Sequence, residues 1–389
     1  MRIGIFTETY KPVINGVVNS VLGFKQGLEA LGHEVFVFCP TYKNYKDESK
    51  DKNIIHMNSL PLPGKSGYHF VFSASDEIKA TAKTMDIIHT QHPFIMGDRA
   101  ADVAKEFNIP IAFTNHTQYE QYSHYIPISK EIVQRSIEWY IKGFSKRVDM
   151  IIAPAPGITK VLKRYSVKTP IEVVANGIDI ERFKKIPPKS EVDKLKIKYN
   201  IKPFDQVLVC TGRIAEEKNL TFLLESFKIL QKSKPDTKLI LIGGGMQIDY
   251  FNNLITKLGL AGSAIITDFV SYNDMPCYLA LADLYVTASK SEVHPLTVLE
   301  GMAAGLPMVI VKAPGTGDIV TDGLDGLVTK DNKNDFVQKI NKLLNDKGLR
   351  NNLAKGAKTT SIKYSIPETT KRLLEVYRKT IKIHNNKEE

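Results

Sequence analysis

Short apolar runs alternate with amphipathic stretches along the whole chain, and this alternation restricts the fold more than any other feature. In the first half, residues 2–6 are mostly apolar at consecutive positions, and residues 16–31 then show apolar residues at helical spacing. Residues 206–210 and 220–232 repeat the pattern in the second half. Strands that are apolar at consecutive positions are buried on both faces, as in parallel sheets covered by helices. The sequence therefore predicts an α/β fold with parallel sheets.

The alternation is interrupted once, at residues 170–189, where Asn176-Gly177 and a Pro-Pro pair are typical of turns. We therefore expect two Rossmann-like domains, residues 1–172 and 173–364, that face a cleft. Parallel sheets bind ligands beyond the carboxyl ends of their strands, so we expect the chemistry there. Further strands are expected at residues 35–39, 87–88, 111–113, 150–152, 239–242, 264–266, 284–286 and 308–311.

Composition and charge exclude several other classes of protein. The chain has 389 residues, and its three scattered cysteines predict neither a disulfide framework nor a metal site. No apolar run reaches the roughly 20 residues of a membrane-spanning helix, so we expect a cytoplasmic protein that can still touch a membrane surface. The net charge of +11 is spread evenly, with 21 Lys and Arg against 16 Asp and Glu in residues 1–170. This even spread argues against a nucleic-acid-binding arm, while the positive sign suits anionic substrates and membranes.

Two glutamates lie in the segment of residues 291–307, which follows a predicted strand. Pro295 is typical of a first helical turn, so Glu292 is expected in a loop over the sheet and Glu300 inside the helix. The N–H groups at a helix start suit a diphosphate. A loop carboxylate beside them can accept hydrogen bonds from sugar hydroxyls, and a second carboxylate can hold a ribose. The alternative is that Glu292 only caps the helix and Glu300 is exposed to solvent.

Two cationic residues follow the strand that ends at Cys210. Gly212 allows a sharp turn, after which Arg213 and Lys218 project from a strand-end loop. Two cations at this position can neutralise a leaving diphosphate. By themselves they could equally be solvated side chains. In the first half, Gly16 lies at a similar strand-to-helix turn and would allow close approach of an anion, or simply begin the helix.

A stretch rich in His and Tyr, residues 115–127, follows another predicted strand. His116 at this strand end could orient a sugar or assist proton movement. Nearby, His89 and His92 lie three residues apart, but no carboxylate or third ligand has matching spacing, so we expect no metal site.

These motifs together resemble the family-4 class of retaining glycosyltransferases with the GT-B fold, over nearly the whole chain. The resemblance implies that Arg213 and Lys218 bind the diphosphate of a nucleotide-sugar donor, that Glu292 holds the transferred sugar, and that Glu300 holds the ribose. It implies no metal or other cofactor. The C-terminal helix, within residues 365–389, would pack back on the first domain, which would bind the acceptor. The further donor-site residues implied are Gly16, Gly243, Gly244, Phe269, Val270, Leu296 and Thr297.

One position departs from the family pattern. Many members have Gly where this chain has Pro295, so a backbone donor is absent there. The donor phosphate would then rely more on the backbone of Leu296 and Thr297.

The His- and Tyr-rich stretch looks like that of bacterial diacylglycerol glucosyltransferases. This likeness implies a membrane lipid as acceptor, UDP-glucose as donor and an α-glycolipid as product, with His116 catalytic and Tyr119, Tyr122 and His124 binding the acceptor. GDP-mannose is the next candidate donor, and a different lipid or a soluble sugar is the alternative acceptor. The apolar and basic residues at 130–147 fit either a helix in a bilayer interface or a helix packed on the sheet.

The family resemblance also implies retention of anomeric configuration, by attack on the face from which the phosphate leaves. Three other classes of function remain open at this point: a non-catalytic nucleotide-sugar-binding protein, a nucleotide-sugar epimerase, and a membrane scaffold. The first would predict loss of a charged site residue, yet all four are present. An epimerase would convert the donor without any acceptor.

Overall fold

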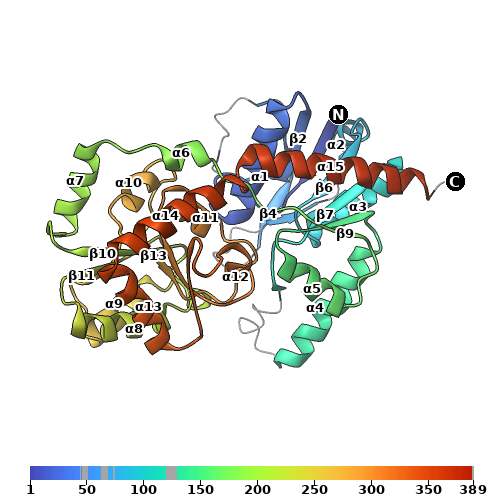
Figure 1. The fold of residues 1–389 in the computed structure, drawn as a ribbon. Helices are drawn as coiled ribbons and strands as arrows, with labels where there is room; N and C mark the ends of the chain where they lie inside the picture. Colours follow the sequence, from blue (N-terminus) through green and yellow to red (C-terminus); the bar gives the residue numbers. More distant parts are fainter. Residues whose placement is uncertain (44, 46–50, 63–68, 73–74, 120–128, 388–389) are drawn as a thin grey trace. The chain divides into compact units, whose positions relative to one another are not determined.

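The computed structural model describes residues 1–43, 45, 51–62, 69–72, 75–119 and 129–387. The chain divides into two compact units, coloured along the sequence in Figure 1. The first unit contains Met1–Gly177 and Ile366–Glu389, and the second contains Ile178–Ser365. The boundaries expected from the sequence lie at 172/173 and 364/365.

The first unit is built on a parallel sheet in which the described residues form seven strands, in the order β3-β2-β1-β6-β7-β8-β9. Most of these strands are buried at consecutive positions, because helices cover the sheet. The strands are β1 (Arg2–Phe6), β2 (Glu34–Pro40), β3 (Ile54–Met57), β6 (Ile87–Thr90), β7 (Ile111–Thr114), β8 (Met150–Ala153) and β9 (Ile171–Val173). A short antiparallel hairpin, β4 (Ser59–Pro61) with β5 (His69–Val71), belongs to the same unit.

Capping side chains begin several helices of the first unit. For example, the Asn15 side chain accepts a hydrogen bond from Val18 N at 2.9 Å, which starts the first helix. The helices are α1 (Gly16–Ala30), α2 (Asp76–Ala82), α3 (Ile95–Phe107), α4 (Lys130–Ser145), α5 (Pro156–Arg164) and α15 (Ile366–Asn385).

The C-terminal helix α15 is part of the first unit and lies along α1 (Figure 1). Gly27 permits this close approach, because a Cβ there would lie 2.1 Å from Thr370 Oγ1. The buried Tyr377 hydroxyl lies 2.7 Å from His89 Nδ1, which ties the helix to the end of β6. This helix therefore contributes to the core on which the N-terminal strands rest.

The second unit has a parallel sheet with the order β12-β11-β10-β13-β14-β15 among its described residues. Its strands are β10 (Gln206–Thr211), β11 (Thr237–Ile242), β12 (Ala264–Ile266), β13 (Leu284–Thr287), β14 (Met308–Val311) and β15 (Gly326–Thr329). Two apolar clusters pack against this sheet. One contains Leu208, Leu239 and Phe336, and the other contains Val209, Ile240 and Met302.

Helices alternate with the strands of the second unit, as the sequence predicts for parallel strands. The helical segments are α6 (Ile180–Lys184), α7 (Lys189–Lys198), η2 (Glu216–Lys218), α8 (Leu220–Ser233), α9 (Ile248–Lys257), α10 (Met275–Leu279), α11 (Leu296–Ala303), α12 (Thr316–Ile319), α13 (Lys333–Asn345) and α14 (Lys347–Ile362). None of the described helices in either unit combines the length and apolarity that crossing a lipid bilayer requires.

Candidate active site

Three loops leave the same edge of the second sheet. They follow β10, β11 and β13, which are neighbours in the order β11-β10-β13 and run parallel. Because the carboxyl ends of parallel strands meet at one edge, residues 212–218, 243–245 and 288–295 are brought together. The sheet order therefore gathers three motifs that are far apart in the sequence.

Gly243 allows the first two of these loops to touch. Its φ is +144°, and a Cβ at this position would lie 2.0 Å from the carbonyl oxygen of Gly212. A Cβ at Gly244 would lie 3.5 Å from Phe269 N, so the loop after β12 is also adjacent. The Phe269 side chain is exposed, whereas Val270 packs partly into the core. The residues expected to surround the nucleotide thus lie next to one another.

Lys218 and Glu292 form an ion pair at this edge, between Nζ and Oε1. The Ser289 hydroxyl also donates to Glu292 Oε1, at 2.9 Å. Burial acts to raise the pKa of Glu292, but the charge and hydrogen bond of Lys218 and the hydrogen bond of Ser289 outweigh it, and the pKa is lowered from its usual value. Glu292 is therefore a carboxylate at neutral pH.

Arg213 belongs to the same group of charges. Its Nε lies 3.3 Å from Glu217 Oε1, and its positive charge contributes to the lowered pKa of Glu292. The Arg213 side chain is 62% exposed, whereas that of Lys218 is mostly covered. One cation is thus held in place by the protein, and the other is accessible to an anionic ligand.

Glu300 lies in α11 and is buried, with 4% of its surface exposed. Its contacts are with the hydroxyl of Tyr272, which forms a hydrogen bond with it, and with the charge of Arg182. Burial raises the pKa of Glu300 to about 7, although both neighbours act to lower it. The alternative of an exposed Glu300 is therefore wrong. So is the alternative of Glu292 as a cap, because no side chain caps α11 and the Glu292 carboxylate is bonded to Lys218.

The helix α11 begins one residue after Pro295, which is its N-cap. The N–H groups of Leu296 and Thr297 belong to the first turn, which has no acceptor within the helix. The Thr297 hydroxyl is hydrogen-bonded to that of Tyr285, which also lies 2.9 Å from Thr211 Oγ1. The side chain of Thr297 is thus bound within the sheet region, and its backbone remains the group that could meet a phosphate.

His294 is a buried residue that the sequence analysis missed. Neither of its ring nitrogens has a hydrogen-bond partner among the described residues, and its ring centroid lies 5.3 Å from that of Tyr364. Burial lowers the pKa of His294 to about 4, so the ring is neutral at physiological pH. The apolar residues Val293 and Leu296, which flank His294 in the sequence, could have indicated that it is buried.

In the first unit, the predicted residues lie at the carboxyl ends of β1, β6 and β7, which are neighbours in the sheet. His116 follows β7, and its Nε2 lies 2.7 Å from Gln91 Oε1 at the end of β6. Gly16 is the first residue of α1, where a Cβ would meet no atom within 4 Å. Tyr119 packs edge-on against Phe94, with ring centroids 5.1 Å apart. Tyr122 and His124 lie outside the described residues.

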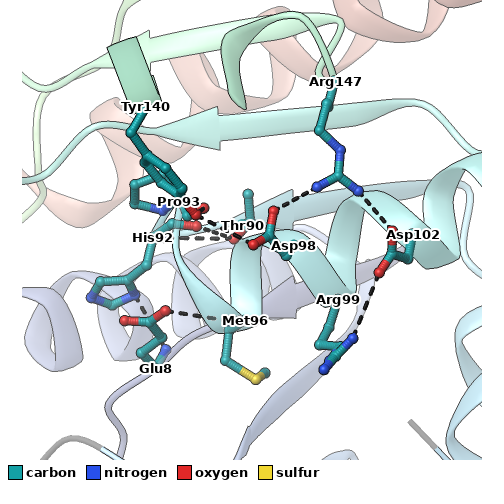
Figure 2. A network of polar contacts seen from close by, with 10 residues as sticks. All are labelled: Glu8, Thr90, His92, Pro93, Met96, Asp98, Arg99, Asp102, Tyr140 and Arg147. Carbon is teal, nitrogen blue, oxygen red and sulfur yellow. Dashed lines mark hydrogen bonds and ion pairs between the residues drawn. The ribbon is translucent and has the colours of Figure 1, made fainter. Parts of the chain in front are cut away.

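Glu8 is a second residue that the sequence analysis missed, although it directly follows the strand region of β1. Figure 2 shows its carboxylate accepting a hydrogen bond from Met96 N at the start of α3, at 3.3 Å. Its own N–H donates to His92 Nδ1 at 3.2 Å. Burial raises the pKa of Glu8 to about 7, despite the lowering effect of the backbone hydrogen bonds. The carboxylate is turned toward the helix start, where it takes the place of a capping side chain.

A second polar group in Figure 2 holds α4 against α3. Tyr140 donates to the carbonyl oxygen of Pro93 at 3.0 Å and to Asp98 Oδ2 at 3.3 Å. Arg147, just beyond α4, pairs with both Asp98 and Asp102. These bonds fix the orientation of α4 relative to the strand-end loop after β6.

Comparison with known proteins matches both halves of the chain to glycosyltransferase families. Residues 14–182 match the protein family described as Glycosyltransferase Family 4, and residues 191–360 match Glycosyl transferases group 1. The chain belongs to glycosyltransferase family 4. The chain is therefore an enzyme, a hexosyltransferase, and the strand-end edge with Lys218, Glu292 and Arg213 lies within the matched part of its second unit.

Named relatives of this family-4 glycosyltransferase extend over most of its length. It is 32% identical to the alpha-monoglucosyldiacylglycerol synthase of Streptococcus pneumoniae, over 84% of this chain and 74% of that protein. It is 30% identical to the enzyme of the same name from Acholeplasma laidlawii, over 94% of each. The crystal structure of Anabaena HepE in complex with UDP-glucose has a TM-score of 0.78, at 18% identity, over 97% of this chain and 100% of that one. This structural likeness shows that the two proteins share the GT-B fold.

Proposed function

We propose that this enzyme transfers glucose from UDP-glucose to diacylglycerol, with retention, and so makes an α-glucosyl lipid. The observation that carries the proposal is the ion pair of Lys218 and Glu292 beside Arg213, at the carboxyl edge of the second sheet. Cations placed at a strand-end edge suit a diphosphate, and an adjacent ionised carboxylate suits the hydroxyls of a sugar. A membrane scaffold would not need this combination.

The donor half of the proposal follows from the groups around this pair. The glycine loop and exposed Phe269 offer a place for the base, and buried Glu300 offers an acceptor for ribose hydroxyls. The related fold of Anabaena HepE was solved with UDP-glucose, which supports the same donor here. UDP-glucose is therefore the first donor to test, and GDP-mannose is the second.

The acceptor half rests on helix α4 and on the relatives. The apolar side chains Val133, Ile141 and Phe144 of this helix are buried, so the interpretation that the helix packs on its own unit is correct for that face. Trp139 and Ile132 nevertheless remain exposed on it, at 76% and 59%. A helix that presents Trp and Ile beside basic side chains suits the interface of a bilayer.

A cavity next to these residues adds to the lipid assignment. It has a volume of about 640 Å³ and is lined by Phe94 and by residues of α4 that include Ile132, Arg135 and Trp139. On the β4–β5 hairpin of the same unit, Leu60 and Phe70 are also exposed. The two relatives that are named for glucosylation of diacylglycerol support a lipid acceptor with one free hydroxyl.

In the proposed reaction, the bond between the sugar C1 and the β-phosphate oxygen breaks as the acceptor oxygen bonds to C1 on the same face. The acceptor proton passes to the departing phosphate oxygen. Arg213 and Lys218 stabilise the negative charge that develops on the diphosphate, and Glu292 holds the sugar. We propose that no metal ion is required, because these two cations supply the charge that a metal would otherwise provide.

The decisive experiment is incubation of the purified chain with radiolabelled UDP-glucose or GDP-mannose and vesicles that contain diacylglycerol. Thin-layer separation should show label in a lipid product with UDP-glucose, and the anomeric proton coupling of that product should be that of an α-glucoside. Label that stays water-soluble with every donor would overturn the lipid assignment. A β-linked product would overturn retention. The variant Lys333→Ala serves as a control for protein handling, because Lys333 pairs with Glu225 at the partly exposed surface of the second unit.

A further inference from the structure

Two buried amide side chains lie at the carboxyl edge of the first sheet with polar atoms left unbonded. Gln91 directly follows β6 and Asn115 directly follows β7, and these strands are paired in parallel, with Thr90 opposite Phe113. Gln91 is 0% exposed and Asn115 is 2% exposed. Neither Gln91 Nε2 nor Asn115 Oδ1 has a hydrogen-bond partner among the described residues. One is a donor and the other is an acceptor.

The polar groups immediately behind them are fully paired. His89 lies 2.6 Å from Thr114 Oγ1 through Nε2 and 2.7 Å from the Tyr377 hydroxyl through Nδ1. The main chain of the two amide residues is also bonded, since Gln91 N donates to Phe6 O at 2.9 Å and Asn115 N to Ile152 O at 3.0 Å. Buried polar groups are expensive to leave unbonded, and most proteins avoid them. At these two strands, the unbonded side-chain atoms Gln91 Nε2 and Asn115 Oδ1 therefore lie at the strand ends, where parallel sheets bind ligands.

We propose that Gln91 and Asn115 form a subsite for the hydroxyl group of the acceptor. An alcohol oxygen can accept from the Gln91 amide while its proton is donated to the Asn115 carbonyl, so one hydroxyl satisfies both atoms. A phosphate or carboxylate would meet repulsion from Asn115 Oδ1, and an ammonium group would meet repulsion from the Gln91 N–H groups. The pair therefore selects a neutral alcohol, which is the chemistry of diacylglycerol.

Gln91 also places His116 beside this subsite. Its amide oxygen is the atom that lies 2.7 Å from His116 Nε2, so one end of the same amide holds the imidazole and the other end faces the hydroxyl. Gln91 is thus a positioning residue for His116 as well as a ligand of the acceptor. This inference rests on the proposed function, because it assigns the hydroxyl to a lipid acceptor.

The first test uses binding and needs no variant. Isothermal titration should show that dioctanoylglycerol binds the wild-type protein at least tenfold more tightly than its deoxy analogue, the dioctanoyl ester of 1,2-propanediol. The two lipids share their acyl chains and differ only in the hydroxyl, so the apolar contribution cancels. Equal binding of the two lipids would overturn the subsite.

The second test uses the variants Asn115→Leu and Gln91→Met, which keep the approximate size of each side chain. Each should lower kcat/KM for diacylglycerol at least tenfold, abolish the preference for the alcohol over the deoxy analogue, and leave the Kd for UDP within twofold. Because Asn115→Leu removes an unbonded buried atom, its Tm should equal or exceed that of wild type. A purely structural role would instead lower the Tm without changing the preference between the two lipids.

Asn341→Leu is the matched control, because Asn341 Oδ1 is likewise buried and unbonded among the described residues but lies in helix α13 of the second unit. Acceptor kinetics of Asn115→Leu within twofold of this control would overturn the subsite. Failure of the wild-type enzyme to glycosylate diacylglycerol would refute the proposed function instead. In that case, the difference in binding between the alcohol and its deoxy analogue would still decide whether the subsite exists.

Discussion

Lys218 Nζ and Glu292 Oε1 are in contact although 74 residues separate them in the sequence. Lys218 ends the short helix after β10, and Glu292 lies in the loop after β13, so the pairing of these two strands brings them together. The Ser289 hydroxyl bonds to the same carboxylate oxygen. In the proposed reaction, a nucleotide-sugar at this edge would therefore meet a carboxylate and a cation already placed against each other.

The first prediction concerns this ion pair. Lys218→Met and Glu292→Gln should each lower kcat/KM by roughly 10²- to 10³-fold, because each removes a group placed for the diphosphate or the sugar. Lys218→Met should also destabilise the fold by about 2 kcal/mol, since it leaves the Glu292 carboxylate without its cation. The double variant should recover part of that stability, as measured by urea denaturation. If the loss of unfolding free energy in the double variant equalled the sum of the losses in the two single variants, the two residues would not be coupled.

The second prediction separates the role of Arg213 from fold stability. Arg213→Ala should lower kcat/KM by about 10²-fold or more, because the variant loses charge stabilisation of the leaving diphosphate. Its unfolding free energy should stay within about 0.5 kcal/mol of wild type, since the side chain is largely exposed. Steady-state kinetics and urea denaturation measure the two quantities. Turnover equal to that of Lys333→Ala would refute the role.

The third prediction is a pH dependence of donor binding. The pKa of Glu300 is raised to about 7 by burial, and in the proposed donor site its carboxylate form would accept hydrogen bonds from the ribose hydroxyls. The Kd for UDP should therefore rise as the pH falls below about 7. Tyr272→Phe should move this transition to higher pH, because the Tyr272 hydroxyl lowers the pKa of Glu300. Glu300→Gln is the control, and an unchanged pH profile in this variant would exclude Glu300 as the titrating group.

The fourth prediction also concerns the Glu300 carboxyl, and it describes how the free energy of unfolding changes with pH. A carboxyl whose pKa is raised on folding stabilises the fold fully below its unfolded value of about 4.5, and this contribution is lost as the pH rises through about 7. Relative to wild type, Glu300→Gln should therefore gain stability between pH 4.5 and pH 8, by roughly 3 kcal/mol. Urea denaturation at the two pH values measures the change. A constant difference across this range would mean that Glu300 has the same pKa in both states.

The fifth prediction concerns the exposed side of α4. Trp139→Glu should reduce binding to anionic vesicles by about tenfold or more, because it removes an aromatic anchor and adds a like charge. The matched control is Ile197→Glu on helix α7, since Ile197 is a similarly exposed apolar residue in the second unit. Vesicle sedimentation measures both. Equal loss in the two variants would show a general effect of charge and would contradict a role for α4.

The strand-end position of the proposed donor-site residues could be predicted from the sequence, because these residues lie in short segments that directly follow apolar strands. Arg213, Lys218 and Glu292 were each placed in a strand-end loop by the position of Cys210 or Thr287 alone. The environment of Glu300 could not be predicted in this way. Its hydrogen bond with Tyr272 and the nearby charge of Arg182 come from other segments of the second unit.

The sequence by itself determined the alternation of strands and helices, since the spacing of apolar residues is a local property. It also indicated the class of enzyme, because the charged motifs resemble those of family-4 glycosyltransferases and can be read directly along the chain. Only the tertiary structure decided which polar side chains are buried together. Glu8, Gln91 and Asn115 lie at the same edge of the first sheet because β1, β6 and β7 are neighbours in it, although these strands are separated in the chain. Strand order depends on how distant apolar faces pack, and no local pattern records it.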